Sequence, residues 1–165
     1  MKKQSAFLKV LEEHKGIIFK VCNMYCSDHE EQKDLVQEVI IQLWKSFDKY
    51  DSSYKLSTWI YRIALNVAIS NYRKLNTRSK YILPMQASFL DVSDEAEDNV
   101  PDDIALLRQF IKGFDEFNKA LMILYLDGNS HEEISKILNI STSNVSTKIN
   151  RLKKKLKEQF KTATS

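Results

Sequence analysis

Helix-breaking residues are scarce in this sequence, which has three glycines and two prolines among 165 residues. Folds built from many β-turns need more of both, because glycine and proline supply the backbone conformations that tight turns require. The scarcity therefore favours long helices joined by short loops. The length suits one ordinary domain or two small ones, and a hydrophobic content of 43% is compatible with a real core.

Long hydrophobic runs are missing as well. No apolar stretch of the sequence approaches the roughly 20 residues that a membrane-spanning helix needs. Lys9, Glu12 and Glu13 interrupt the first apolar segment, so that it does not have the pattern of a signal peptide. We expect a cytoplasmic protein that does not insert into a membrane.

Cysteine is rare, and the positions of the two cysteines limit their chemistry. Cys22 and Cys26 are four residues apart and His29 follows three residues later, a spacing that can present three metal ligands on one helix face. No fourth ligand is obvious nearby, and a pair of cysteines in a cytoplasmic chain does not indicate a structural disulfide. We expect buried free thiols, with no metal and no cofactor.

Sequence motifs for catalysis are lacking. His14, His29 and His131 lie far apart in the sequence, which has no glycine-rich phosphate loop, no zinc-protease motif and no nucleophile elbow. Residues that are distant in sequence can converge in a fold, so the expectation that this protein is not an enzyme rests on motifs alone.

The charge of the chain is unevenly distributed. The net charge is +3. Residues 1–75 hold 12 Lys and Arg against 9 Asp and Glu, residues 76–118 hold 4 against 9, and residues 119–165 hold 9 against 4. Two basic blocks joined by an acidic one indicate two modules that face nucleic acid and a linker that avoids phosphate.

Apolar residues recur at helical spacing in the first part of the chain and predict one helix over roughly residues 4–25 and a second that opens in the segment 27–30 and runs to about residue 47. The segment from Ser27 to Glu30 has the pattern of a capping box, with Ser27 as the cap of the second helix. The polar side of that helix is either simply solvated or a docking face for another protein. This side carries Asp34, Gln37, Glu38 and Gln42.

A third helix is predicted over residues 56–74, with Ser57 or Thr58 as its cap. Its apolar face consists of Trp59, Ile60, Ile63, Ala64, Val67 and Ala68. Off that face, or at its edge, lie Tyr61, Arg62, Asn66, Asn71, Tyr72, Arg73 and Lys74. Aromatic rings stack on bases, amides read base edges and cations meet phosphates, so this side suits single-stranded nucleic acid. The alternative is an ordinary core helix with a solvated polar side.

Helical periodicity fails between Asn76 and Pro101, where Pro84 and an acidic run over residues 91–98 indicate a flexible linker. A short helix is predicted over residues 103–114. Isolated apolar residues in the linker could dock in a groove; these are Tyr81, Ile82, Leu83, Met85, Phe89 and Leu90.

The C-terminal part of the chain has a helix-turn-helix pattern. A helix over residues 117–126 stops at Gly128, which can adopt the left-handed conformation, and Ser130 with Glu133 has the pattern of a second capping box. A short helix, a turn at residues 139–141 and a helix over residues 142–160 follow. The last helix carries polar side chains suited to base edges and then lysines suited to phosphates, although a merely solvated lysine-rich helix is the alternative. The base-facing candidates are Asn144, Ser146, Thr147, Lys148, Asn150 and Arg151.

These elements predict an all-α protein with two small helical domains. An N-terminal helical bundle covers residues 1–75, an acidic flexible linker covers 76–105, and the helix-turn-helix domain covers 106–165.

Two ordered motifs resemble a known family. D-L-V-Q-E-V-I-I-Q-L-W at residues 34–44 and T-W-I-Y-R-I-A-L-N at residues 58–66 are similar to conserved region 2 of bacterial extracytoplasmic-function (group 4) sigma factors of the sigma-70 family. Residues 131–156 are similar to their region 4. The resemblance implies a protein that binds core RNA polymerase, directs it to specific promoters and assists DNA melting.

The resemblance also implies roles for the candidate residues. The polar side with Asp34, Gln37, Glu38 and Gln42 would dock on the clamp of the β′ subunit, and the six residues of the last helix would enter the −35 major groove. The loop at residues 50–55 and the helix after it would meet the −10 element, with Asn66 beside a pocket for a flipped-out base. The implied −10 set is Trp59, Tyr61, Arg62, Asn66, Arg73 and Lys74. Promoter DNA, the polymerase β flap and an anti-sigma factor are the further partners that the resemblance implies.

Some positions depart from the family pattern. The segment 116–118 stands where the family often has a leucine-proline pair, and Ser146 and Thr147 stand where basic residues are frequent, which leaves the −35 sequence open. A stand-alone helix-turn-helix regulator with an N-terminal sensing or dimerisation bundle is the main alternative, and a helical adaptor that binds only proteins is another. The block 34–66 separates these hypotheses, because a stand-alone regulator does not need it.

Overall fold

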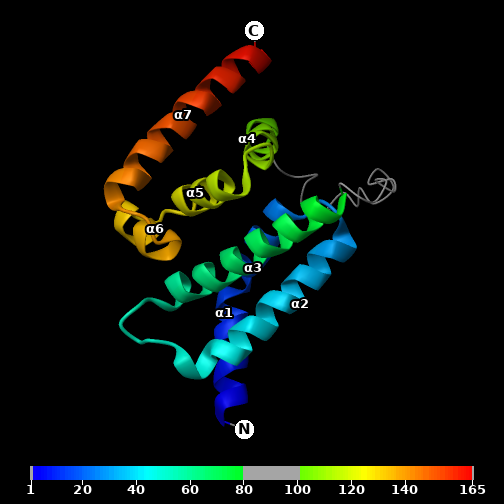
Figure 1. Cartoon of the computed structure of the whole chain (residues 1–165), viewed down its shortest axis with the longest axis vertical. Coiled ribbons are helices and arrows are strands. Elements are labelled where there is room, and N and C mark those ends of the chain that lie inside the picture. Colours follow the sequence, from blue (N-terminus) through cyan, green and yellow to red (C-terminus); the bar gives the residue numbers. More distant parts are fainter. Residues whose placement is uncertain (1, 80–100, 165) are drawn as a thin grey trace. The chain divides into compact units, whose positions relative to one another are not determined.

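The computed structural model describes residues 2–79 and 101–164, and the chain forms two compact units, Met1–Val92 and Ser93–Ser165 (Figure 1). Every regular element in the described residues is a helix, which confirms the predicted all-α fold.

The first unit is a bundle of three long helices. These are α1 (Lys2–Tyr25), α2 (His29–Ser46) and α3 (Leu56–Ser79), and a short 3-10 helix, η1 (Phe47–Lys49), follows α2. Each long helix contacts the other two, and α1 packs most extensively against α3. Their apolar faces bury a shared core that includes Ile18, Val21, Leu35, Val39, Leu43, Ile60 and Leu65.

The starts of α2 and α3 differ from the sequence prediction. Asp28, not Ser27, caps α2, because its Oδ1 accepts a hydrogen bond of 3.2 Å from the backbone N–H of Glu30. The helical hydrogen bonds of α3 begin at Lys55, whose carbonyl accepts from the N–H of Trp59 at 3.1 Å. Ser57 and Thr58 therefore lie inside the first turn of α3 and do not cap it.

The buried face of α3 is displaced by about one residue from the predicted face. Tyr61 is only 1% exposed, so the prediction that it lies off or at the edge of the apolar face is wrong. Trp59, Ile63 and Val67, which were assigned to that face, are only partly buried. The physical reason is that α1 and α2 both pack against α3, so the position of both helices decides which side of α3 is buried. The buried stripe consists of Ile60, Tyr61, Ala64, Leu65 and Ala68.

The second unit contains four helices: α4 (Asp102–Lys112), α5 (Glu116–Leu126), α6 (His131–Leu138) and α7 (Thr142–Thr164). The longest, α7, contacts each of the other three. Its apolar residues recur at intervals of three and four, which places them on one side of the helix. This side is buried at Val145, Ile149, Leu152 and Leu156.

Local hydrogen bonds define the helix-turn-helix. Ser130 caps α6 by accepting a 3.1 Å bond from the N–H of Glu133, and Gly128 has a φ of 87°, so both sequence predictions are confirmed. Asn139 ends α6 in the left-handed conformation, with a φ of 57°. Oγ of Ser141 then accepts from the N–H of Asn144 at 3.1 Å at the start of α7. Caps of this kind are each worth about 1 kcal/mol.

The helices reach further towards the linker than the sequence indicated. α3 continues to Ser79 and α4 begins at Asp102, so both overlap the ends of the predicted linker at 76–105. The acidic run and the apolar residues between Tyr81 and Leu90 lie outside the described residues. None of the helices in the described ranges combines the length and the apolar character that crossing a bilayer requires.

Candidate protein-docking and nucleic-acid interfaces

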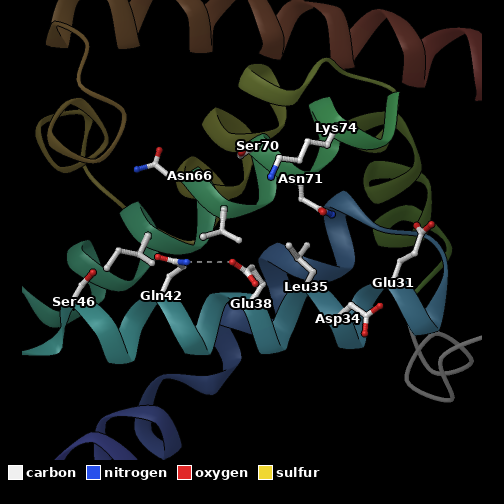
Figure 2. Close-up of a pocket in the computed structure, with 12 residues that line it drawn as sticks. Glu31, Asp34, Leu35, Glu38, Gln42, Ser46, Asn66, Ser70, Asn71 and Lys74 are labelled. Atoms are coloured by element: carbon white, nitrogen blue, oxygen red, sulfur yellow. Dashed lines mark hydrogen bonds between the residues drawn. The ribbon is translucent and has the colours of Figure 1, made fainter. Parts of the chain in front are cut away.

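An open groove of about 800 Å³ lies between α2 and α3 of the first unit (Figure 2). One wall is formed by α2, through Glu31, Asp34, Glu38 and Gln42. The other wall is formed by α3, through Asn66, Ser70, Asn71 and Lys74. Glu31, Asp34, Glu38 and Gln42 on α2, and Asn66, Ser70 and Lys74 on α3, recur at intervals of three or four, with Asn71 next to Ser70. Residues at that spacing share one side of a helix. The helical repeat of each segment therefore builds a continuous wall.

The wall on α2 is anionic. Burial raises the pKa of Glu31, and repulsion from Asp28 and Asp34 raises it further. Nε2 of Gln42 donates a hydrogen bond of 3.2 Å to Oε1 of Glu38, the dashed line in Figure 2. Carboxylates near a helix N-terminus are favoured by the helix dipole, which helps to keep this cluster charged in spite of the repulsion. Such a wall attracts a cationic partner surface.

The wall on α3 has a different character. Asn66 and Ser70 are exposed, Asn71 is partly buried, and Lys74 is exposed near the far end of the groove. Amide groups can donate to and accept from base edges, and a lysine can meet a phosphate. One groove thus brings together two sets of residues that the sequence assigned to different partners.

Not every predicted residue lies in the groove. Of the four residues assigned to polymerase docking, Gln37 is exposed on α2 but does not line the groove. Of the −10 set, Arg73 is exposed, while Trp59 and Arg62 lie near the start of α3 and are partly buried. Tyr61 is buried in the bundle, so its side chain cannot contact DNA in this conformation.

Sequence reasoning missed apolar residues on the exposed side of α2. Ile41 is 46% exposed, and Trp44 is 37% exposed. The Trp44 ring packs edge-on against Phe7 with centroids 5.1 Å apart, and Nζ of Lys3 lies 4.3 Å from the Trp44 centroid. Ile41 lies seven residues after Asp34 and three after Glu38, a spacing that could have placed it beside the acidic side chains.

The loop between η1 and α3 carries tyrosines to which the sequence assigned no individual role. Tyr50 packs against Trp59 with ring centroids 5.2 Å apart. The guanidinium of Arg62 lies 5.9 Å from the ring centroid of Tyr54. The two tyrosines at the ends of a short polar loop were the only signal of this arrangement in the sequence.

The second unit presents the predicted base-facing residues on α7. Asn144, Thr147, Asn150 and Arg151 are exposed, whereas Ser146 and Lys148 are partly buried. Nζ of Lys148 lies 5.4 Å from the ring centroid of Phe117, so this lysine packs against α5. Oγ1 of Thr147 donates to the carbonyl of Ser143 at 3.0 Å. The leading half of α7 therefore offers short polar groups and cations on its open side.

A second pocket, of about 760 Å³, lies at the other end of α7. It is lined mainly by apolar groups of Met122, Tyr125, Leu156 and Phe160, and by Leu126, which is 51% exposed. The pocket is separate from the base-facing residues, because it uses α7 only from Lys153 onward.

The two cysteines are buried free thiols, as expected. Burial raises the pKa of the Cys22 thiol to about 12, and the neighbouring Cys26 adds to the increase. His29, the third ligand considered, is exposed at the start of α2. The described residues contain no group of three or more His, Cys, Asp or Glu side chains that could hold a metal ion.

The bundle with its groove and the helix-turn-helix unit define a protein of two helical domains. Family models agree: sigma-70 region 2 matches residues 10–78, and sigma-70, region 4 matches residues 118–156. The chain belongs to the sigma-70 family, in its extracytoplasmic-function (ECF) group, and is an RNA polymerase sigma factor. Sigma factors in general are not enzymes.

Individual relatives support this assignment along nearly the whole chain. The ECF RNA polymerase sigma factor SigW of Bacillus subtilis (strain 168) is 29% identical and aligns with 96% of this chain and 90% of its own length. The RNA polymerase sigma factor SigZ of the same organism is 32% identical, with 76% of this chain and 70% of its own length covered. A stand-alone regulator is not favoured, because the match extends through region 2.

Two solved structures share the fold. CnrH in complex with the cytosolic domain of CnrY has a TM-score of 0.69 at 19% identity and covers 96% of this chain and 90% of its own. The sigma factor RpoE from Bartonella quintana, in complex with the anti-sigma factor NepR, has a TM-score of 0.64 at 19% identity and covers 96% of both chains.

Proposed function

We propose that this sigma factor divides promoter recognition between its two units. Residues 1–75 act as region 2, which binds core polymerase, reads the −10 element and helps to melt it. Residues 106–165 act as region 4, which reads the −35 element, and residues 76–105 link the two. The groove between α2 and α3 carries the proposal, because it joins an anionic docking wall to an amide-bearing and lysine-bearing wall.

Core polymerase binds to α2 in this proposal. The contacts to the β′ clamp come from Asp34, Gln37, Glu38 and Gln42. Carboxylates on an exposed helix attract a cationic surface and fix its orientation. The exposed side chains of Ile41 and Trp44 add the apolar area that a stable protein interface needs at its centre.

The −10 element binds along α3. Arg62, Asn66, Ser70 and Lys74 follow one another at intervals of four, which forms a single stripe along the helix. A melted strand that follows this stripe meets cations at both ends, with the amide of Asn66 and the hydroxyl of Ser70 between them. Asn66 lies beside an extruded base and reads its edge by hydrogen bonding. Trp59 and Arg73 flank the stripe, and the buried Tyr61 is not part of it.

The −35 element binds to α7. The N-terminal half of α7 enters the major groove, where short polar side chains reach base edges and cations reach phosphates. The contacts come from Asn144, Ser146, Thr147, Lys148, Asn150 and Arg151. Support comes from the exposure of four of these six residues on one helix next to a complete turn.

Two further partners complete the proposal. The β flap of polymerase occupies the apolar pocket between α5 and α7, which leaves the base-facing half of α7 accessible. An anti-sigma factor binds this chain as well, an inference supported by the structures of CnrH with CnrY and of RpoE with NepR. The protein acts in the cytoplasm, where polymerase and promoters are, and carries no catalytic activity, cofactor or metal of its own.

Transcription with purified core polymerase and a promoter library tests the proposal. We expect the chain to direct initiation from a distinct set of promoters that core polymerase alone does not use. Sequencing the 5′ ends of the transcripts then gives the −10 and −35 sequences. Tight binding of the chain alone to duplex DNA, together with no promoter-specific initiation, would refute the proposal.

A further inference from the structure

The loop before α3 is held in one shape by its own residues. Oδ1 of Asp51 accepts from the N–H of Ser53 at 3.0 Å, and the carbonyl of Asp51 accepts from the N–H of Tyr54 at 3.1 Å. These two bonds close a tight turn, because aspartate side chains commonly bond to the backbone two residues further on. Hydrogen bonding from Ser53 also lowers the pKa of Asp51, because it stabilises the carboxylate.

Tyr50 closes the loop from its other side. Its hydroxyl donates a hydrogen bond to the carbonyl of Tyr54, across the turn. The position of the backbone at Tyr54 therefore depends on where the Tyr50 side chain lies.

The Tyr50 ring is attached to the core of the bundle by a row of aromatic contacts. It packs against the ring of Trp59. The ring centroids of Trp59 and Phe47 are 6.2 Å apart, and those of Phe47 and the buried Phe7 are 5.3 Å apart. Aromatic pairs at these separations attract each other beyond what the burial of apolar area supplies. Through Tyr50, the loop is therefore packed against the core of the bundle, which restricts its movement.

The product of this arrangement is an exposed aromatic surface at the start of α3. Tyr54 is 37% exposed, and the guanidinium of Arg62 lies 5.9 Å from its ring centroid. Asn66 follows Arg62 by one helical turn, so an aromatic ring, a cation and an amide lie in order along one side of the region. An aromatic ring beside a cation is the arrangement on which unpaired bases stack.

We propose that Tyr50 is a positioning residue, which fixes the loop at 51–55 so that Tyr54, with Arg62, forms a stacking surface for one unpaired base of the promoter. The inference rests on the proposed −10 role of α3 and adds the loop residues that prepare it. In this proposal the main role of Trp59 is to hold the Tyr50 ring in place. Because the surface is formed before DNA arrives, the base does not have to order the loop, which preserves affinity.

The test uses polymerase holoenzyme reconstituted with the full-length chain. The probe is a single-stranded oligonucleotide with the non-template −10 sequence of a promoter selected by the library, prepared with each of the four bases at every −10 position. The variants are Tyr54→Ala, Tyr54→Phe and Tyr50→Phe, with Ser52→Ala as the control in the same loop. Affinity for core polymerase and thermal unfolding are measured for each.

Tyr54→Ala should weaken oligonucleotide binding about 5- to 100-fold, the range that one stacked base supplies, while Tyr54→Phe should restore it. Tyr50→Phe keeps the ring and loses only the hydroxyl, so it should weaken binding about 2- to 10-fold. It should also flatten the base preference at one −10 position, an effect that a merely structural role would not produce. Core binding should stay unchanged in all variants.

Wild-type binding by Tyr54→Ala, or equal losses for Tyr54→Ala and Tyr54→Phe, would overturn the stacking surface. An unaltered base preference in Tyr50→Phe would overturn the positioning role. These failures are distinct from failure of the proposed function, in which the wild-type chain itself gives no promoter-specific initiation with core polymerase.

Discussion

Glu38 of α2 and Asn66 of α3 line the same groove, on opposite walls (Figure 2). The proposed polymerase contact and the proposed base contact are therefore neighbours across one space, although they come from separate helices. Loss of one contact should consequently be separable from loss of the other, provided that polymerase binding and DNA opening are measured independently.

Asn66→Ala should impair promoter opening more than it impairs polymerase binding. The exposed amide makes no contribution to the core, and the loss of one or two hydrogen bonds to an extruded base should reduce opening about 2- to 10-fold. Opening can be followed by the fluorescence of a base analogue in the −10 element. The control is Gln4→Ala, which removes an exposed amide on α1 that does not line the groove. Equal loss of opening and of polymerase affinity in Asn66→Ala would contradict the base-reading role.

Asp34→Asn and Glu38→Gln should weaken binding of core polymerase while leaving the bundle folded. Both carboxylates are exposed, and removal of a charge from an interface mainly slows association and reduces its salt dependence. We expect the rate of association with core polymerase to fall a few-fold for each variant at low salt, and to fall less at high salt. Glu12→Gln on α1 is the control, because its carboxylate lies on a different helix. Identical association rates for wild type and both variants would be inconsistent with docking through this wall.

Lys148→Gln and Arg151→Gln should each lower the salt dependence of promoter binding by the holoenzyme. One phosphate contact contributes about 0.9 to the slope of log affinity against log salt concentration. Arg151 is exposed, whereas Lys148 rests over Phe117, so Arg151→Gln should approach the full value more closely. The control is Lys112→Gln on α4, outside α7. A slope that does not change in either variant would rule out phosphate contacts at these positions.

The Cys22 thiol should make stability depend on pH in the alkaline range. Burial raises its pKa to about 12 in the folded state, from an ordinary value of 9.0. Its stabilising effect is complete below pH 9, and it is lost as the pH rises towards 12, because the unfolded state ionises first. Urea denaturation between pH 8 and pH 11 should show a smaller decrease of stability for Cys22→Ala than for wild type. The prediction would be wrong if stability fell equally with pH in wild type and Cys22→Ala. It would also be wrong if the native thiol were alkylated rapidly at pH 8.

The sequence predicted most of the fold because local signals and packing agree in most places. Ser130 bonds to Glu133 as its spacing indicated, and the apolar repeat from Val145 to Leu156 is the buried side of α7. At the start of α2 two neighbouring residues could both serve as the cap, and the backbone geometry selected Asp28. A choice between adjacent caps depends on one pair of dihedral angles, which residue types alone do not specify.

The candidate site was predicted less completely, for reasons that concern tertiary packing. Asn66 was identified correctly as exposed, but Tyr61 was not recognised as buried, because the number of helices that cover α3 cannot be read from α3 itself. The support of Tyr54 by Tyr50 depends on a ring contact to Trp59 across a turn. Contacts of this kind follow from the course of the loop rather than from a periodic pattern.

The most direct test of the central claim is the reactivity of promoter thymines with permanganate, which modifies unpaired thymine. Promoter DNA is treated with core polymerase alone, with the chain alone and with both. We predict reactive thymines in the −10 region only when both proteins are present. Melting by the chain alone, or no melting with both at a promoter to which the chain binds, would contradict its assignment as the promoter-opening subunit of polymerase.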